Sequence, residues 1–254
     1  MKSGRKFAIL VLTVAGAVVL ALAIPPIAQD PAYHRFADTR EFFGVPNFFD
    51  VVSNAGFLLV GLLGVHSVFA ASETLEVAER RAYFTLFVAI IATGFGSAYY
   101  HLAPDNARLF WDRLPLAIVV MAFTSAIISE RASAKTATAA LIILTLTGAA
   151  SVFYWRASEI AGQGDLRFYG LVQFLPMLLV PLMVWFFPSR HSGASNLVWV
   201  LAWYGVAKAC EHFDSQILSA TGMISGHTLK HVFAALALYF ILRMVQARRR
   251  AASA

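Results

Sequence analysis

The sequence has few of the residues on which soluble or disulfide-bonded proteins depend. Only 13% of its 254 residues are charged, whereas soluble domains average about 25%. Its single cysteine, Cys210, excludes a disulfide within the chain and a metal site built from several thiolates. Any metal that the chain binds must therefore be held by nitrogen and oxygen atoms.

Hydrophobic residues make up most of the chain. They account for 59% of the sequence, and the mean hydropathy is +0.69. Many uncharged runs are long enough to cross a hydrocarbon core of about 30 Å, which takes about 20 helical residues. Because a lipid core offers no water to backbone N–H and C=O groups, such runs must form α-helices. We therefore expect an all-α fold, a polytopic bundle of transmembrane helices.

The hydrophobic runs predict eight helices and no separate soluble domain. These helices are expected at residues 7–27, 47–70, 83–102, 110–129, 136–156, 168–187, 196–217 and 226–246.

The first run also has features of a secretory signal, because "MKSGRK" precedes it and Ala21-Leu22-Ala23 resembles a cleavage site. However, no charge occurs between Lys6 and Asp30, a stretch longer than the usual signal core of about 7–15 residues. We expect residues 1–29 to form a retained transmembrane helix, with a cleaved signal peptide as the alternative.

The net charge of +6 does not indicate a nucleic-acid partner, because the basic residues lie in short segments beside the hydrophobic runs, as topology signals do. The positive-inside rule places both termini in the cytoplasm, with residues 247–254 as a basic cytoplasmic tail. Arg113 is assigned to the smaller set of basic residues in or beside the outer loops. The protein is predicted to be an integral protein of the cell's inner membrane.

Several polar side chains lie where the predicted helices end on the outer side. The stretch "GSAYYHLAPDNARLFWDRLPLAI" carries Ser97, His101 and Asp112 at the junction of two hydrophobic runs. The last run opens with "SGHTLKH", in which His227 and His231 are four residues apart and share one face of a helix. The predicted topology brings all five side chains to a similar depth.

Ionisable residues at membrane depth are costly, so they usually face the bundle interior around a functional site. Three neutral imidazoles leave one coordination position for water, as catalytic zinc requires, and zinc-bound water has a pKa near 7. Asp112 could take and return a proton, and Ser97 could donate to a developing oxyanion. The residues alone leave open a metal-dependent membrane enzyme and a haem protein, since haem also recruits membrane histidines.

The motifs "SAYYH", "WDRLP" and "HTLKH" resemble the S-x-x-x-H, D and H-x-x-x-H motifs of the alkaline ceramidases, and "SNAGFLLVG" is similar as well. These enzymes belong to a superfamily of seven-helix membrane hydrolases that includes adiponectin-receptor-like proteins and glycosylphosphatidylinositol-remodelling lipases. The resemblance implies a seven-helix hydrolase core over residues 30–246, with residues 1–29 as an additional N-terminal helix.

The resemblance also implies a zinc amidase that cleaves ceramide within the membrane to a sphingoid base and a fatty acid. His101, His227 and His231 would bind zinc, Asp112 would be the general acid and base, and Ser97 would assist the zinc and the oxyanion. Three alternatives remain: a zinc-dependent lipase that cleaves a phospholipid ester, a receptor with structural zinc, and the haem protein.

The resemblance further implies a calcium site before the first core helix. Here the stretch "YHRFADTREFFGVPNFFDVVSN" is interrupted by Arg35 and Arg40, so solvated loop charge is the alternative. The oxygen donors that could hold calcium are Asp38, Glu41, Asn47 and Asp50.

A second polar segment, "KACEHFDSQ", precedes the last helix. Lys208 and Glu211 are spaced to form an ion pair, and together with Asp214 they either orient a zinc histidine or cap the outer rim of the bundle. Lys230, between the paired histidines, is expected to snorkel to the membrane interface.

Overall fold

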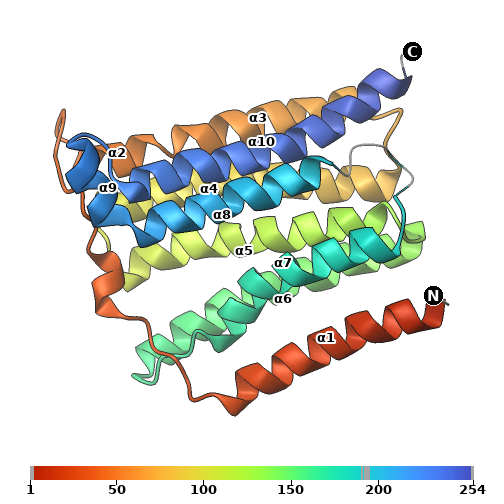
Figure 1. Cartoon of the computed structure of the whole chain (residues 1–254), viewed down its shortest axis with the longest axis horizontal. Coiled ribbons are helices and arrows are strands. Elements are labelled where there is room, and N and C mark those ends of the chain that lie inside the picture. Colours follow the sequence, from red (N-terminus) through yellow and green to blue (C-terminus); the bar gives the residue numbers. More distant parts are fainter. Residues whose placement is uncertain (1–2, 190, 192–194, 253–254) are drawn as a thin grey trace.

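The computed structural model describes residues 3–189, 191 and 195–252, and this part of the chain is a helical bundle without β-strands (Figure 1). The predicted all-α fold is confirmed, and each of the eight predicted runs contains a helix. The elements are α1 (Ser3–Ala23), the 3-10 helix η1 (Pro31–His34), α2 (Phe48–Val52), α3 (Ala55–Ala70), α4 (Val77–Leu102), α5 (Asn106–Ser129), α6 (Ala134–Ile160), α7 (Arg167–Phe186), α8 (Asn196–His212), α9 (Asp214–Thr221) and α10 (Gly226–Ala252).

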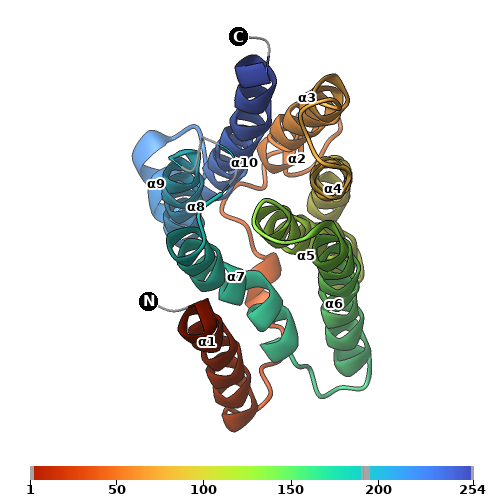
Figure 2. The ribbon, with the colours of Figure 1, turned by 90° about the vertical axis from the view of Figure 1, so that its right-hand side faces the viewer.

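Seven helices in the described residues are long and apolar enough to cross a membrane, as expected of an integral membrane protein. Among the long helices α5 is the most buried, and it packs against α4, α6 and α7 (Figure 2). The shorter α8 lies beside α10. Both termini lie at one end of the bundle, and η1, α2 and α9 lie at the other (Figure 1).

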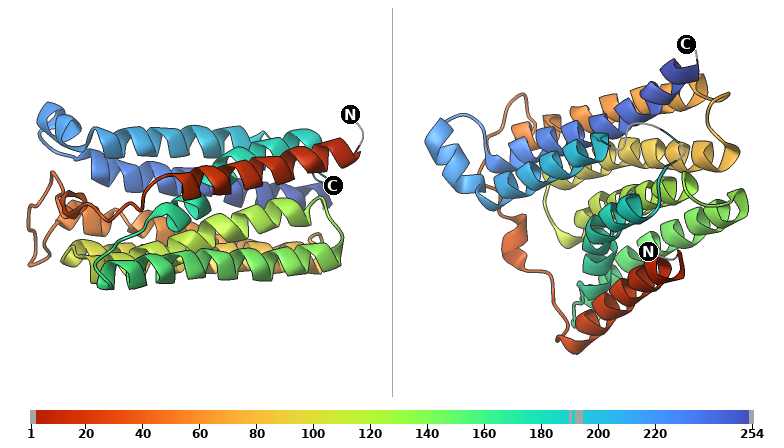
Figure 3. Two further views of the ribbon diagram at one scale, coloured as in Figure 1. Left: turned by 90° about the horizontal axis from the view of Figure 1, so that it is seen from below. Right: turned by 45° about the vertical axis from the view of Figure 1, so that its right-hand side comes forward.

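The N-terminal helix α1 lies at the edge of the bundle, next to α7 (Figure 3). Its ends are fastened by two long basic side chains: Lys6 donates to the carbonyl of Phe186 at 2.6 Å, and Arg167 donates to that of Ile24 at 2.6 Å. No residue in its most hydrophobic stretch is buried. α1 therefore contributes little to the packing of the other helices.

The run predicted at 47–70 is interrupted between α2 and α3. Ser53 Oγ and Asn54 Nδ2 both donate to the carbonyl of Asp50, at 3.1 and 2.7 Å. Such bonds from side chain to backbone compete with the helical hydrogen-bond ladder. The interruption therefore has a local cause in two polar residues within a hydrophobic run.

The run predicted at 196–217 divides at Phe213, between α8 and α9. Gly226, the first residue of α10, packs against this point, where a Cβ would overlap the carbonyl of Cys210 and the backbone of Asp214. Only glycine permits this approach, so Gly226 allows the start of α10 to pack against the end of α8.

A buried ion pair joins α5 to α10 at the end of the bundle that holds both termini. The Glu130 carboxylate pairs with Arg248 and accepts a hydrogen bond from Tyr83 at 2.6 Å, while Arg131 lies 2.9 Å from its second oxygen. Arg248 belongs to the segment predicted as a basic tail. In the structure α10 continues to Ala252, and the Arg248 side chain is buried within the bundle.

Candidate metal centre

Three histidines from two helices meet at the end of the bundle opposite the termini. His101 lies in the last turn of α4, and His227 and His231 lie in the first turns of α10. Their exposed fractions are 1%, 5% and 2%. The structure thus brings together the three histidines that the sequence singled out.

The three imidazole rings form a nearly equilateral triangle, with centroids 4.8 Å apart for His101 and His227, 5.0 Å for His101 and His231, and 4.9 Å for His227 and His231. Nε2 of His101 lies 3.3 Å from Nε2 of His227. Two nitrogens bound to one tetrahedral zinc are separated by about this distance, given Zn–N bonds of about 2.0–2.1 Å. The group could therefore hold a metal ion, whereas rings in contact leave no room between them for a haem macrocycle.

The hydrogen bonds of His231 show which of its nitrogens is free for a ligand. Ser53 Oγ lies 2.8 Å from Nδ1, whereas Nε2 is buried and has no hydrogen-bond partner in the described part of the chain. Leaving such a nitrogen unsatisfied costs about 1–3 kcal/mol. A metal ion bound at Nε2 would satisfy it, and the bond to Ser53 would fix the ring orientation, as partners of metal-bound histidines do.

Asp214 fastens the start of α10 to the segment that precedes α2. Its Oδ1 accepts from the backbone N–H of His227 at 2.7 Å, and its Oδ2 accepts from that of Ala37 at 3.0 Å. The ring of Phe36 packs on His227 and His101, with centroids 4.4 and 4.6 Å apart. Asp214 therefore positions His227 by accepting a hydrogen bond from the backbone of this histidine and not from its ring.

A close approach of α4 and α5 places Ser97 beside Asp112. A Cβ on Gly96 would overlap the carbonyl of Trp111, so glycine is required at this contact. That carbonyl lacks its helical N–H partner, because Pro115 follows four residues later. The side chains of Ser97 and Asp112 interact and both line one cavity.

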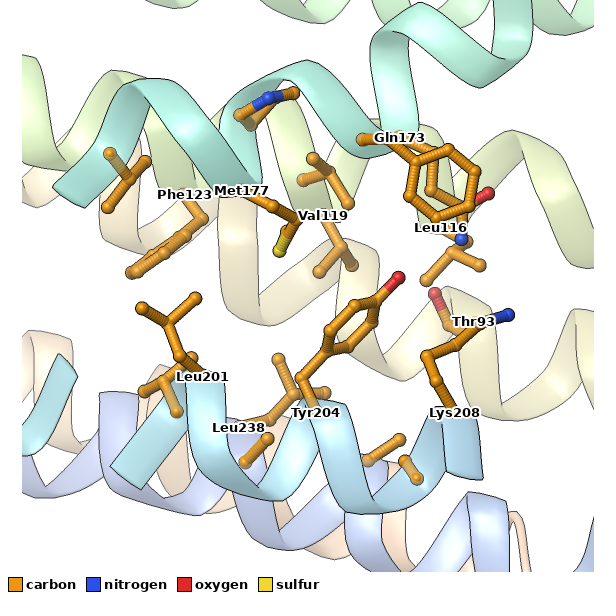
Figure 4. A pocket seen from close by; sticks show the side chains of 18 of the residues that line it. Thr93, Leu116, Val119, Phe123, Gln173, Met177, Leu201, Tyr204, Lys208 and Leu238 are labelled. Atoms are coloured by element: carbon orange, nitrogen blue, oxygen red, sulfur yellow. The ribbon is translucent and has the colours of Figure 1, made fainter. Parts of the chain in front are cut away.

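This cavity lies among α5, α7, α8 and α10. Its volume of about 540 Å³ is typical of small-ligand sites. Figure 4 shows Thr93, Gln173 and Lys208 towards one end and mainly apolar side chains towards the other. Ser97, Asp112 and His231 also line it. The apolar part is formed by residues that include Phe123, Met177, Leu201 and Leu238.

The prediction that Lys230 snorkels to the interface is wrong. Its ammonium nitrogen lies 2.9 Å from Nε2 of His227 and 3.3 Å from Oε1 of Glu211. Glu211 also forms the predicted ion pair with Lys208. Glu211 therefore reaches the histidine cluster only through Lys230, which is itself part of the site.

Three of the four possible calcium ligands, Asp38, Asn47 and Asp50, contact other groups. The Arg40 guanidinium, 2.7 Å from the Asp38 carboxylate, holds the pKa of Asp38 below its usual value. Asn47 donates to the carbonyl of His101 at 2.7 Å, and Asp50 accepts from a hydroxyl of α10 at 2.6 Å. Among the described residues, the three histidines are the only group of histidine, cysteine or carboxylate side chains with metal-ligand spacing. Asp38, Glu41 and Asp50 are not part of that group, and the calcium site formed by these residues and Asn47 stays a prediction.

Two further residues belong to this region, although the sequence did not single them out. Ser53 lies in "SNAGFLLVG", and the signal that marks it is a Ser-Asn pair inside a hydrophobic run. Arg113 was treated as a loop charge, yet it lies within α5 and lines the cavity.

No protein-family model and no curated protein matches the sequence.

Proposed function

We propose that the protein is a zinc-dependent hydrolase within the membrane that cleaves the amide bond of a ceramide-like lipid. The products would be a sphingoid base and a fatty acid. The observation that carries this proposal is the cluster of three buried histidines, one of which lines an apolar cavity together with Asp112 and Ser97. The resemblance of the motifs to those of alkaline ceramidases supports the choice of reaction.

Five polar residues of the site have roles in this reaction. Zinc held by His101, His227 and His231 would supply a nucleophile at neutral pH by lowering the pKa of water. Asp112 would take up a proton during attack and return it to the leaving amine. Ser97, which interacts with Asp112, would orient that carboxylate and donate to the oxygen on which negative charge develops.

The cavity suits a substrate that enters from the bilayer. Its apolar walls would hold an acyl chain among α5, α7, α8 and α10, while the amide lies at the polar end beside Asp112. The histidines lie at the end of the bundle opposite both termini (Figure 1). With the orientation given by the positive-inside rule, the reaction would take place near the non-cytoplasmic face of the membrane.

The test combines metal analysis with lipid hydrolysis by the purified protein. Wild type is expected to contain about one zinc per chain and to hydrolyse ceramide. His231→Ala should lose zinc and hydrolysis together, because it removes one of three ligands. His66→Ala is the matched control, since His66 lies in α3 outside the cluster and should keep both.

Four outcomes would contradict the proposal. Hydrolysis without metal would exclude the mechanism, and zinc without hydrolysis of any lipid would favour a receptor with structural zinc. Faster cleavage of a phospholipid ester than of ceramide would favour a lipase. A strong Soret absorption of the purified protein would indicate haem instead.

A further inference from the structure

Arg113 is a buried arginine without an acidic partner in the described part of the chain. It directly follows Asp112 on α5 and is only 5% exposed. Its Nη2 donates to Oε1 of Gln29 at 2.6 Å, whereas its Nη1 is buried and has no hydrogen-bond partner among the described residues. No ion pair among the described residues includes it, although a guanidinium remains charged in proteins.

Three aromatic rings surround the Arg113 guanidinium. Its central carbon lies 4.4 Å from the ring centre of Trp155, 4.9 Å from that of Tyr169 and 5.4 Å from that of Tyr33. These rings come from α6, α7 and η1. Ring faces attract a cation and fix its plane, but they carry no net negative charge. The three rings therefore hold the guanidinium rigidly without neutralising its charge.

The lining of the cavity contains more basic than acidic side chains. Three basic side chains, Arg113, Lys208 and Lys230, face two acidic ones, Asp112 and Glu211. Both lysines are paired with Glu211. Within the described residues, Arg113 is therefore the basic side chain of this cavity that forms no ion pair with a carboxylate.

We infer that Arg113 binds an anionic oxygen group, a phosphate or a carboxylate, on the lipid that occupies the cavity. A guanidinium offers parallel N–H donors that match the oxygens of these two groups, and Nη1 of Arg113 is unused. Because Arg113 and Asp112 line the same cavity, the anionic group lies in the cavity that holds the bond to be cleaved. It belongs either to the substrate head group or to the fatty acid that is released.

The identity of this lipid rests on the proposed function, but the binding itself does not. Binding of dodecyl phosphate, dodecanoate and neutral dodecanol is therefore measured calorimetrically in a neutral detergent, without turnover. Wild type should bind both anions at least about tenfold more tightly than the alcohol, which is what a charge-assisted hydrogen bond contributes. Arg113→Gln should remove this difference, and Arg113→Lys should keep part of it.

The matched control is Arg108→Gln. Arg108 lies on the same helix but pairs with Asp105 and is half-exposed, so its replacement should leave anion binding unchanged. Equal affinity of wild type for all three ligands would overturn the inference, whether or not any variant folds. Unchanged anion binding by folded Arg113→Gln would also overturn it, because a purely structural arginine would lower only the thermal stability.

Hydrolysis then distinguishes the two sources of the anion. If Arg113 binds a head group, wild type should cleave ceramide 1-phosphate with a higher kcat/KM than ceramide, and Arg113→Gln should lose this preference. If it binds the released fatty acid, Arg113→Gln should instead relieve inhibition by dodecanoate and leave the preference unchanged. Absence of all hydrolysis would refute the proposed function, while the binding measurements would still decide the role of Arg113.

Discussion

The hydroxyl oxygen of Ser53 lies 2.8 Å from Nδ1 of His231, which leaves Nε2 as the nitrogen available to a metal ion. The two residues are 178 positions apart in the sequence. They meet because the helical run is interrupted at Ser53, between α2 and α3, where α10 packs alongside. The interruption of the helix therefore also places Ser53 where it contacts a histidine of the cluster.

Replacing Ser53 with alanine should weaken metal binding. Partners that orient metal-bound histidines typically contribute about 10–100-fold to metal affinity, so Ser53→Ala should lower zinc affinity by that factor. The measurement is competition with a chelator of known affinity. Ser53→Thr keeps the hydroxyl and should retain most of the affinity. Equal zinc affinity of wild type and Ser53→Ala would show that this hydrogen bond does not support the metal.

Replacing Asp112 with asparagine should separate metal binding from catalysis. Asparagine has nearly the same size but cannot take up and return a proton, so Asp112→Asn should keep zinc while hydrolysis falls by about 10²–10⁴-fold. Zinc content and initial rates are measured on the same preparation. Asp105→Asn is the control, because Asp105 caps α5 at its exposed start and asparagine caps a helix equally well. A rate close to that of wild type would exclude Asp112 as the general acid and base.

A large side chain within the apolar part of the cavity should select against long acyl chains. Leu201 lines the cavity on α8 (Figure 4), and Leu201→Trp would fill part of its volume. Overfilling a packed site costs about 1–3 kcal/mol, so kcat/KM for a long-chain ceramide should fall about 5–150-fold. A short-chain ceramide should be affected less.

Leu62→Trp provides the comparison for this experiment, because Leu62 is 60% exposed on α3 and does not line the cavity. It should leave the chain-length profile unchanged. An equal loss for short and long chains in Leu201→Trp would indicate general misfolding and contradict the assignment of the acyl chain to this cavity.

The positions of the helices follow from the sequence because a lipid core forces long uncharged runs into helices. The interruptions at Ser53 and Phe213 do not follow in the same way. The first depends on side-chain bonds to the carbonyl of Asp50. The second depends on the close approach of Gly226 from another helix, which no local pattern reveals.

The histidine cluster was predictable because four-residue spacing places His227 and His231 on one face, and the topology brings His101 to the same end. The surroundings of the cluster were not. Lys230 turns inward because Glu211 on α8 attracts it. Arg113 lies inside the bundle because rings from η1, α6 and α7 surround it. Both positions depend on partners that are distant in the sequence.

The acid stability of the protein should depend on Glu130, at the end of the bundle far from the histidines. Burial alone would raise the pKa of Glu130, but the charge of Arg248 and the hydrogen bond from Tyr83 hold it below its usual value of 4.5. The folded state therefore binds this proton less tightly than the unfolded state. The stability contributed by the carboxylate is present above pH 4.5 and is lost as the pH falls through the folded-state pKa.

Glu130→Gln should lower the free energy of unfolding by about 3–5 kcal/mol near neutral pH, because it leaves the buried Arg248 without its carboxylate. The variant should also lose part of the acid dependence of wild type. Both effects are read from thermal unfolding in neutral detergent between pH 7 and about 3.5. The double variant Glu130→Gln with Arg248→Met should recover much of the loss, since it removes the uncompensated cation.

The exposed Glu73 supplies the matched control, and Glu73→Gln should unfold as wild type does at every pH. The zinc content of Glu130→Gln should equal that of wild type, because the ion pair and the histidines lie at opposite ends of the bundle (Figure 1). Unfolding of Glu130→Gln at the wild-type midpoint would show that this ion pair does not stabilise the fold. A double variant less stable than Glu130→Gln would show that Arg248 stabilises the bundle by packing and not through its charge.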